Sequence, residues 1–281
     1  MMKISRDYGL FWNQIRRISS MTPGLVTSER LEKGIEVLTM NNDKRGNCLS
    51  VPMLKELDAA ITKANKSKDV RALVICGGPK FFSAGHDLRE LHPDRSQTSR
   101  EEVFTTCARV MLNLANADIP SVAAVRGIAF AAGCQLVAQC DLAVAGQSST
   151  FSTPGVKLGF FCSTPGVPLV RAIGMRAAKE LLMTGKVIDA NRAYALNLVQ
   201  KVVPDDQVIE AAVALANEIT QHSRPVIAMG RQCLMQQTYM NLKEAYDLAT
   251  KVLLENLKLG DASRGIDAFT HKKPTPKWLD K

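Results

Sequence analysis

The sequence has few aromatic residues, few histidines and no paired cysteines. Aromatic residues make up 5% of the 281 residues. With no Lys/Arg block or nucleic-acid motif, this argues against a nucleic-acid partner. The four histidines lack ligand spacing, so no metal site is expected. The seven cysteines contain no C-x-x-C pair. Several lie in apolar runs, which is typical of buried free thiols in a reducing compartment.

Long apolar runs are also missing. The longest, within residues 121–133, is too short for a membrane span. The composition, 46% hydrophobic and 22% charged, fits one large globular domain with or without an appendage. The net charge of +9 suits an anionic ligand such as a nucleotide-bearing thioester, and it suits an ordinary soluble surface equally well.

The first 24 residues contain arginines but almost no acids, with apolar residues at roughly helical spacing. This pattern is typical of a mitochondrial transit peptide, whereas a secretory signal needs an unbroken apolar core. A disordered or capping N-terminus is the alternative.

From Gly34 onward the pattern alternates between strands and helices. Strands are expected at 35–40, 70–76, 121–125 and 141–145, and helices at 51–64, 101–117 and 133–139. After residue 164 the chain is mostly helical, with helices expected at 164–173, 177–183, 190–196, 207–221, 225–236 and 241–257. The sequence therefore predicts an α/β core over 25–203 and a helical region over 204–281, whose wide apolar faces suggest an oligomer.

Two segments, residues 81–88 and 127–136, run from apolar residues through glycine and alanine to polar residues. Small residues let a ligand approach the backbone, and the first N–H groups of a helix lack partners within it. One N–H group from each segment, aimed at one point, would form an oxyanion hole for a carbonyl oxygen that gains charge. Tight packing between a strand and a helix is the plainer explanation.

Several motifs in order carry a family resemblance. They are Lys44–Ser50, Phe82–Leu88, Gly127–Leu136, Cys140–Ala145 and Phe151–Gly159. Together they resemble the crotonase (enoyl-CoA hydratase/isomerase) superfamily over about residues 30–270. The resemblance implies a spiral of stacked ββα turns with a helical C-terminal trimerisation region. It also implies a fatty acyl-CoA ligand, no further cofactor, and a homotrimer or hexamer. The run Phe151–Gly166 is most similar to a mitochondrial branch, which implies a matrix protein of fatty acid metabolism.

The resemblance also implies roles for individual residues. The oxyanion donors would be the backbone N–H groups of His86 and Ala132, with Gly133 as the nearest alternative. The CoA contacts would be Lys44, Arg45 and Ala84, and the acyl pocket would include Phe160, Phe161 and Cys162. Because the donors belong to the backbone, the imidazole of His86 is expected to contact ligand or to pack. Asp87 and Asp141 are expected to be structural, and Cys134 and Cys162 to be packing residues.

At the positions where the family that this sequence resembles carries acid/base carboxylates, the sequence has Gln135, Gly155 and Ser163. A glutamine amide does not titrate near neutrality, although it can hydrogen-bond a water, and glycine has no side chain. Three alternatives follow: an acyl-CoA-binding protein with an atypical or lost acid/base set, an active hydratase or isomerase that holds water through Gln135 and Ser163, or a non-catalytic regulatory partner in lipid metabolism. Glutamate at 135, alone or with glutamate at 155, is expected to create or raise hydratase activity.

Overall fold

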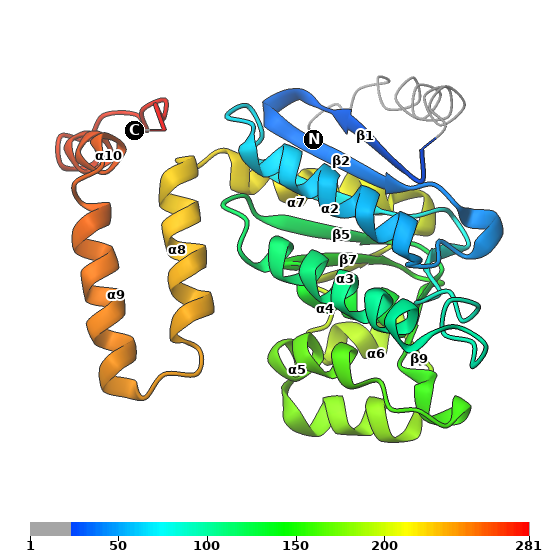
Figure 1. Ribbon diagram of the computed structural model, residues 1–281. Coiled ribbons are helices and arrows are strands. Elements are labelled where there is room, and N and C mark those ends of the chain that lie inside the picture. The colour runs from blue at the N-terminus through cyan, green and yellow to red at the C-terminus, as the bar shows by residue number, and fades with distance from the viewer. Residues whose placement is uncertain (1–23, 281) are drawn as a thin grey trace.

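The computed structural model describes residues 24–280 (Figure 1). The predicted transit peptide therefore lies outside the described residues, apart from Gly24. None of the helices in the described part of the chain combines the length and the apolar character needed to cross a membrane.

The core is built on a six-stranded sheet. Its order is β1 (Val26–Arg30), β2 (Ile35–Met40), β3 (Ala72–Cys76), β5 (Ser121–Val125), β7 (Leu142–Gly146) and β10 (Lys201–Val203). Strand β1 pairs antiparallel with β2, and every other pair is parallel. The central strands are buried along their whole length, as parallel strands covered on both faces are.

A second sheet contains four very short strands. Its order is β4 (Phe81–Ser83), β6 (Ile128–Phe130), β8 (Thr150–Ser152) and β9 (Ile188–Asp189). In chain order β3 leads to β4, β5 to β6 and β7 to β8, and the helices α3 (Gln97–Ala115), α4 (Ala132–Gln139) and α5 (Ser163–Thr184) follow. This is the spiral of stacked ββα turns that the resemblance implied.

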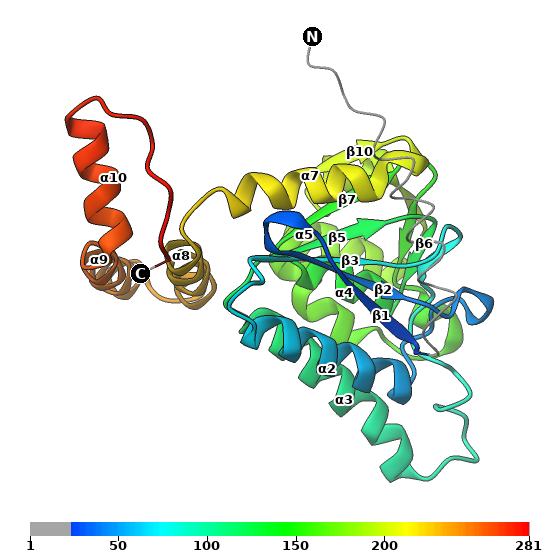
Figure 2. The same ribbon diagram turned by 90° about the horizontal axis from the view of Figure 1, so that it is seen from above.

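Helices cover both faces of the large sheet (Figure 2). Helix α7 (Val208–Thr220) lies on one face, where Val37, Val74 and Val122 form a core with it. Helices α2 (Val51–Lys66), α3 and α4 lie on the other face, where Leu38, Leu73 and Ile75 pack into the larger core. Alternate residues of each strand thus serve the two cores.

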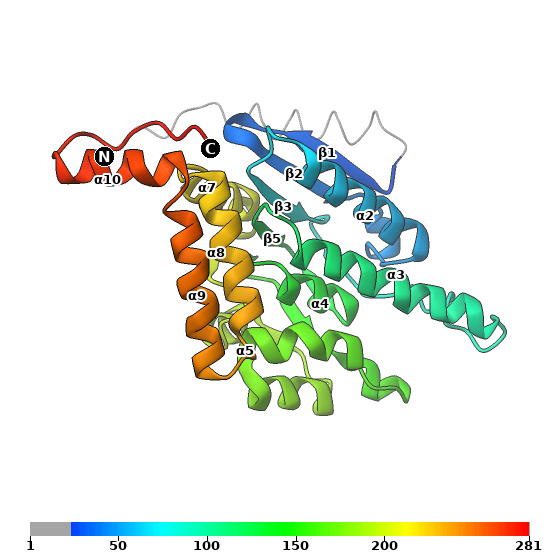
Figure 3. The ribbon, with the colours of Figure 1, turned by 60° about the vertical axis from the view of Figure 1, so that its left-hand side comes forward.

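The last three helices form an arm that extends from this body. They are α8 (Arg224–Gln237), α9 (Leu242–Asn256) and α10 (Gly260–Thr270). Figures 1 and 3 show α8 and α9 side by side, with α8 facing α5. The predicted helical region at 204–281 therefore divides in two, because α7 packs on the sheet and only the helices from Arg224 onward form the arm. Helix α6 (Ala190–Ala195) lies beside β9 and β10.

Arg231 of α8 connects the arm to the body through an ion pair and several hydrogen bonds. Its guanidinium pairs with Asp141 at 2.7 Å and donates to the carbonyl oxygens of Leu114, Ala115 and Ala117, at the end of α3. Asp141 also accepts from the N–H and the hydroxyl of Ser121. The structural role expected for Asp141 is therefore confirmed.

Candidate functional site

The two segments of small residues meet directly. Gly85, after β4, has φ = +98°, and a Cβ placed on it would lie 2.8 Å from the Cβ of Ala131. A Cβ on Gly133 would lie 2.3 Å from the carbonyl oxygen of Ser83. Helix α4 thus packs on β4 at a distance that only glycine permits.

Ala131 has an unusual backbone conformation for a residue with a side chain, with φ = 47° and ψ = −117°. Its N–H donates to the carbonyl oxygen of Ser152 on β8 at 2.9 Å, which helps to hold this turn in place. Such strained residues persist only where the surrounding structure determines them, and they cluster at functional sites. The turn brings the chain from β6 directly into the first residues of α4.

The backbone N–H groups of His86 and Ala132 have no acceptor within residues 24–280. Both residues line one cavity of about 860 Å³. A Cβ on Gly85 would lie 3.3 Å from the nitrogen of Ala132, so the two segments bring their N–H groups to the same wall. An oxyanion hole needs two such donors aimed at one oxygen, and this pair is the candidate for it.

The remaining walls of this cavity are largely apolar. They include Phe160, Phe161 and Cys162, which were predicted to form the acyl pocket, as well as Leu88, Leu91 and Phe104, which were not. Phe104 lies on α3 and Leu88 and Leu91 on the loop before it. No motif marks this stretch, and its nearness to the site follows only from the path of the chain between β4 and α3.

The imidazole of His86 is held in one tautomer. Its Nδ1 lies 3.1 Å from the carbonyl oxygen of Leu49 and must donate to it, because a carbonyl only accepts. Nε2 is buried and lacks a partner in the described part of the chain. The ring of Phe104 meets the imidazole edge to face at 5.4 Å between centroids. Burial lowers the pKa of His86, so the ring is neutral at pH 7.

The three substituted acid/base positions differ in their access to the cavity. Gly155 and Ser163 line it, but Gln135 does not. Gln135 is only 3% exposed, and its Oε1 has no partner among residues 24–280. Gly133, the alternative donor, also lies away from the lining.

The space beside Gly155 is already filled. A Cβ at this position would lie 2.7 Å from Sγ of Cys162 and 2.8 Å from the carbonyl oxygen of Phe160. A glutamate at 155 therefore does not fit unless the loop moves, which counts against the expectation that a second glutamate can simply be restored. Burial raises the pKa of the Cys162 thiol and raises that of Cys134 to about 12, so both are protonated at pH 7. Protonated thiols are poor nucleophiles.

The predicted CoA contacts, Lys44, Arg45 and Ala84, do not all line the cavity. Ala84 lines the cavity, whereas Lys44 and Arg45 belong to a 3₁₀ turn, Asp43–Arg45, and do not. Arg45 lies 3.5 Å from Asp87. Asp87 also accepts from the guanidinium of Arg89 at 2.8 and 2.6 Å. Asp87 is therefore a structural residue, as expected.

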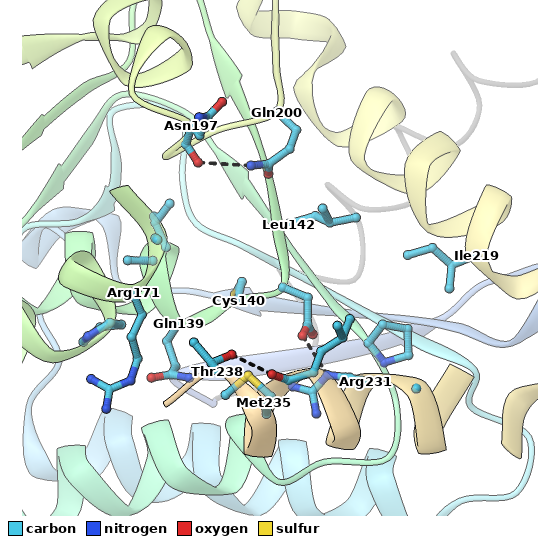
Figure 4. A pocket seen from close by; sticks show the side chains of 18 of the residues that line it. Gln139, Cys140, Leu142, Arg171, Asn197, Gln200, Ile219, Arg231, Met235 and Thr238 are labelled. Atoms are coloured by element: carbon cyan, nitrogen blue, oxygen red, sulfur yellow. Dashed lines mark hydrogen bonds and ion pairs between the residues drawn. The ribbon is translucent and has the colours of Figure 1, made fainter. Parts of the chain in front are cut away.

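A second cavity of about 820 Å³ lies between α8 and the body of the molecule (Figure 4). Gln139, Arg171, Gln200, Arg231 and Met235 are among the residues around it. None of the residues predicted to form the site contributes to it. The predicted site residues that line either of these two cavities thus all line the first one.

Comparison with known proteins identifies the family. A family model for enoyl-CoA hydratase/isomerase matches residues 30–281. Mitochondrial enoyl-CoA hydratase domain-containing protein 3 of rat is 43% identical over 253 residues, which cover 90% of this chain and 84% of the relative. The human protein of the same name is 42% identical over 263 residues, covering 94% and 86%.

Solved structures agree with the sequence matches. The crystal structure of human enoyl-CoA hydratase domain-containing protein 3 has a TM-score of 0.86 at 40% identity and covers 90% of this chain and 99% of its own. An enoyl-CoA hydratase from Mycobacterium smegmatis has a TM-score of 0.87 at 38% identity, covering 90% and 98%. The chain therefore belongs to the enoyl-CoA hydratase/isomerase, or crotonase, family.

Proposed function

We propose that this protein binds a fatty acyl-CoA thioester in the 860 Å³ cavity, with the thioester oxygen accepting from the N–H groups of His86 and Ala132. The observation that carries the proposal is the pair of unpartnered backbone donors at one wall of a largely apolar cavity. One such donor is typically worth about 3–4 kcal/mol when charge develops on the oxygen.

The proton-transfer part of the site is atypical. Gln135 does not line the cavity, Gly155 has no side chain, and Ser163 is a neutral hydroxyl. General acid–base catalysis typically contributes about 10²–10⁴-fold per group. Classical hydratase activity should therefore be weak. Thioester hydrolysis and decarboxylation depend less on such a pair of carboxylates, so they fit the site better than hydration does.

The proposal extends to location and assembly. Mitochondrial relatives over 40% identical and the composition of residues 1–24 support a mitochondrial matrix protein. The exposed apolar side chains of the arm, among them Leu253 and Leu254, support a homotrimer or a hexamer. Both expectations follow the family resemblance.

Isothermal titration calorimetry with saturated acyl-CoA thioesters of increasing length tests the proposal. Binding at one or more chain lengths is expected, with weaker binding of free CoA. If no thioester binds, the proposal fails. Crotonyl-CoA turnover, followed as loss of the conjugated thioester absorbance, tests the second part. A rate equal to that of a normal hydratase would refute the argument from the missing carboxylates.

A further inference from the structure

One charged side chain that lines the cavity has no partner in the part of the chain that the structure describes. Besides the neutral His86, two basic residues line it, His92 and Arg100. His92 lies 3.1 Å from the carboxylate of Asp94. The side chain of Arg100 is partly buried and has no hydrogen-bond or ion-pair partner within residues 24–280. Glu102, two residues further along the chain, pairs with Lys55 of α2 at 2.8 Å.

Arg100 lies on α3 and lines the same cavity as the two backbone donors, His86 and Ala132. It precedes Phe104 by four residues, so the two residues share one face of the helix, with Cβ atoms typically about 5–6 Å apart at this spacing. The ring of Phe104 is 5.4 Å from that of His86. An acyl chain that starts at the N–H of His86 and runs past Phe104 therefore reaches Arg100 within the same cavity.

We propose that the acyl chain bound here carries a free carboxylate at the end opposite the thioester, and that this carboxylate pairs with Arg100. The inference rests on the proposed function, and it makes the ligand a dicarboxylic acyl-CoA. A guanidinium binds a carboxylate through two parallel hydrogen bonds. Arg100 is partly buried and shares the cavity lining with the apolar Leu88, Leu91 and Phe104, so its charge is partly shielded from water and favours an anionic partner.

The phosphates of CoA are the other anions that a thioester would bring. They are separated from the thioester by the long pantetheine arm, whereas Arg100 lies one helical turn from Phe104, close to the oxyanion donors. Lys44 and Arg45, the cations predicted to contact CoA, belong to the 3₁₀ turn Asp43–Arg45 and do not line the cavity. The geometry thus assigns Arg100 to the acyl chain.

Matched pairs of thioesters test the assignment in the full-length protein. Affinity is measured by calorimetry for butanoyl-CoA against succinyl-CoA, hexanoyl-CoA against adipoyl-CoA, and octanoyl-CoA against suberoyl-CoA. At the best chain length the dicarboxylic ligand should bind about tenfold more tightly, as expected for a partly buried charged hydrogen bond. The preference should peak at one length, because the reach from His86 to Arg100 is fixed.

Variants at Arg100 separate the outcomes. Arg100→Gln should reduce the preference ratio to about one, and Arg100→Lys should retain part of it. Arg109→Gln is the matched control, because Arg109 lies on the same helix, pairs with Asp58 at 3.1 Å and does not line the cavity. It should leave the ratio unchanged, and melting temperatures verify that each variant is folded.

Two results would overturn the assignment while leaving the proposed function intact. One is equal binding of both members of every pair by the unmodified protein. The other is an equal loss for both members in Arg100→Gln, which would mean that Arg100 meets the CoA moiety. If no thioester of either kind binds, the proposed function itself fails.

Discussion

Gly85 and Gly155 line or shape the same site, but they are glycine for different reasons. Gly85 has φ = +98°, a conformation that residues with a side chain rarely adopt, and it touches Ala131. Gly155 has an ordinary φ, but Cys162 and Phe160 fill the space beside it. Gly85 allows the segments that carry the N–H groups of His86 and Ala132 to pack closely. Gly155 leaves room for Cys162 and Phe160 in the space that a side chain would take.

Replacing Gly85 by alanine should therefore abolish binding of acyl-CoA. The new Cβ would be strained by the positive φ, at about 1–3 kcal/mol, and it would lie 2.8 Å from the Cβ of Ala131, pushing the two donor segments apart. Calorimetry with the tightest-binding thioester measures the loss. Gly174→Ala is the control, because Gly174 also has a positive φ, +77°, but nothing lies within 4 Å of its Cβ position. Equal binding by both variants would contradict the prediction.

His86 should make stability depend on pH. Burial lowers its pKa below the value of 6.5 for an exposed histidine. The unfolded chain therefore takes up a proton near pH 6.5 that the folded chain does not, and the free energy of unfolding falls as the pH drops below 6.5 towards the folded pKa. Urea unfolding at about pH 5.5 and about pH 7.5 measures this difference.

The same unfolding measurement on His86→Gln should show a smaller difference between the two pH values. His92→Gln serves as the control, because His92 is exposed. An unchanged pH dependence in His86→Gln would exclude burial of a neutral imidazole as its source.

At the scale of secondary structure, most elements of five or more residues were predictable, although β1 and α10 were missed, and the shorter strands were not predictable. The strand expected at 35–40 is β2, that at 121–125 is β5, and the helix expected at 133–139 is α4 with one added residue. These segments carry a clear apolar period or a continuous buried run. The helices expected at 164–173 and 177–183 form one element, α5, with a break at Gly174.

The small sheet, by contrast, had no signal of its own. Strands β4, β6 and β8 have three residues each, too few for any period to appear. Their place is set by pairing with one another after each strand of the large sheet ends. The sequence marked two of these segments only through glycine and alanine. It predicted a possible oxyanion hole there without predicting the sheet that carries it.

The junction between α8 and the body depends on Arg231. Replacement by methionine should destabilise the protein by about 3–5 kcal/mol, because it leaves Asp141 without its cation and removes the guanidinium hydrogen bonds to three carbonyl oxygens. Urea unfolding measures the change, and hydrogen exchange over residues 224–237 should rise as the arm detaches. Arg264→Met, an exposed arm residue with one bond to the carbonyl oxygen of Lys277, should change stability by less than about 1 kcal/mol. Similar losses in both variants would show that the junction is not held by Arg231.

At the scale of the whole molecule, the arm lacks a core of its own. Helix α9 has no buried residue, and several large apolar side chains of the arm are more than half exposed, including Leu234, Leu242, Tyr246 and Phe269. Exposed apolar area on this scale marks an interaction site. The periodicity of these helices was predictable, but the separation of the arm from the body was not, since it follows from where α7 packs.

The assembly proposed for this protein can be tested on the exposed side of α9. Leu253 and Leu254, 59% and 57% exposed, should become buried in a trimer, so that their joint replacement by lysine places two charges in an apolar interface. Light scattering coupled to size exclusion should then show the mass of one chain in place of three or six. Leu112→Lys on α3, where the leucine is 61% exposed but belongs to the body and not to the arm, should leave the assembly intact. An unmodified protein that is already monomeric would refute the trimer, whereas an oligomer that survives both lysines would move the interface to another face.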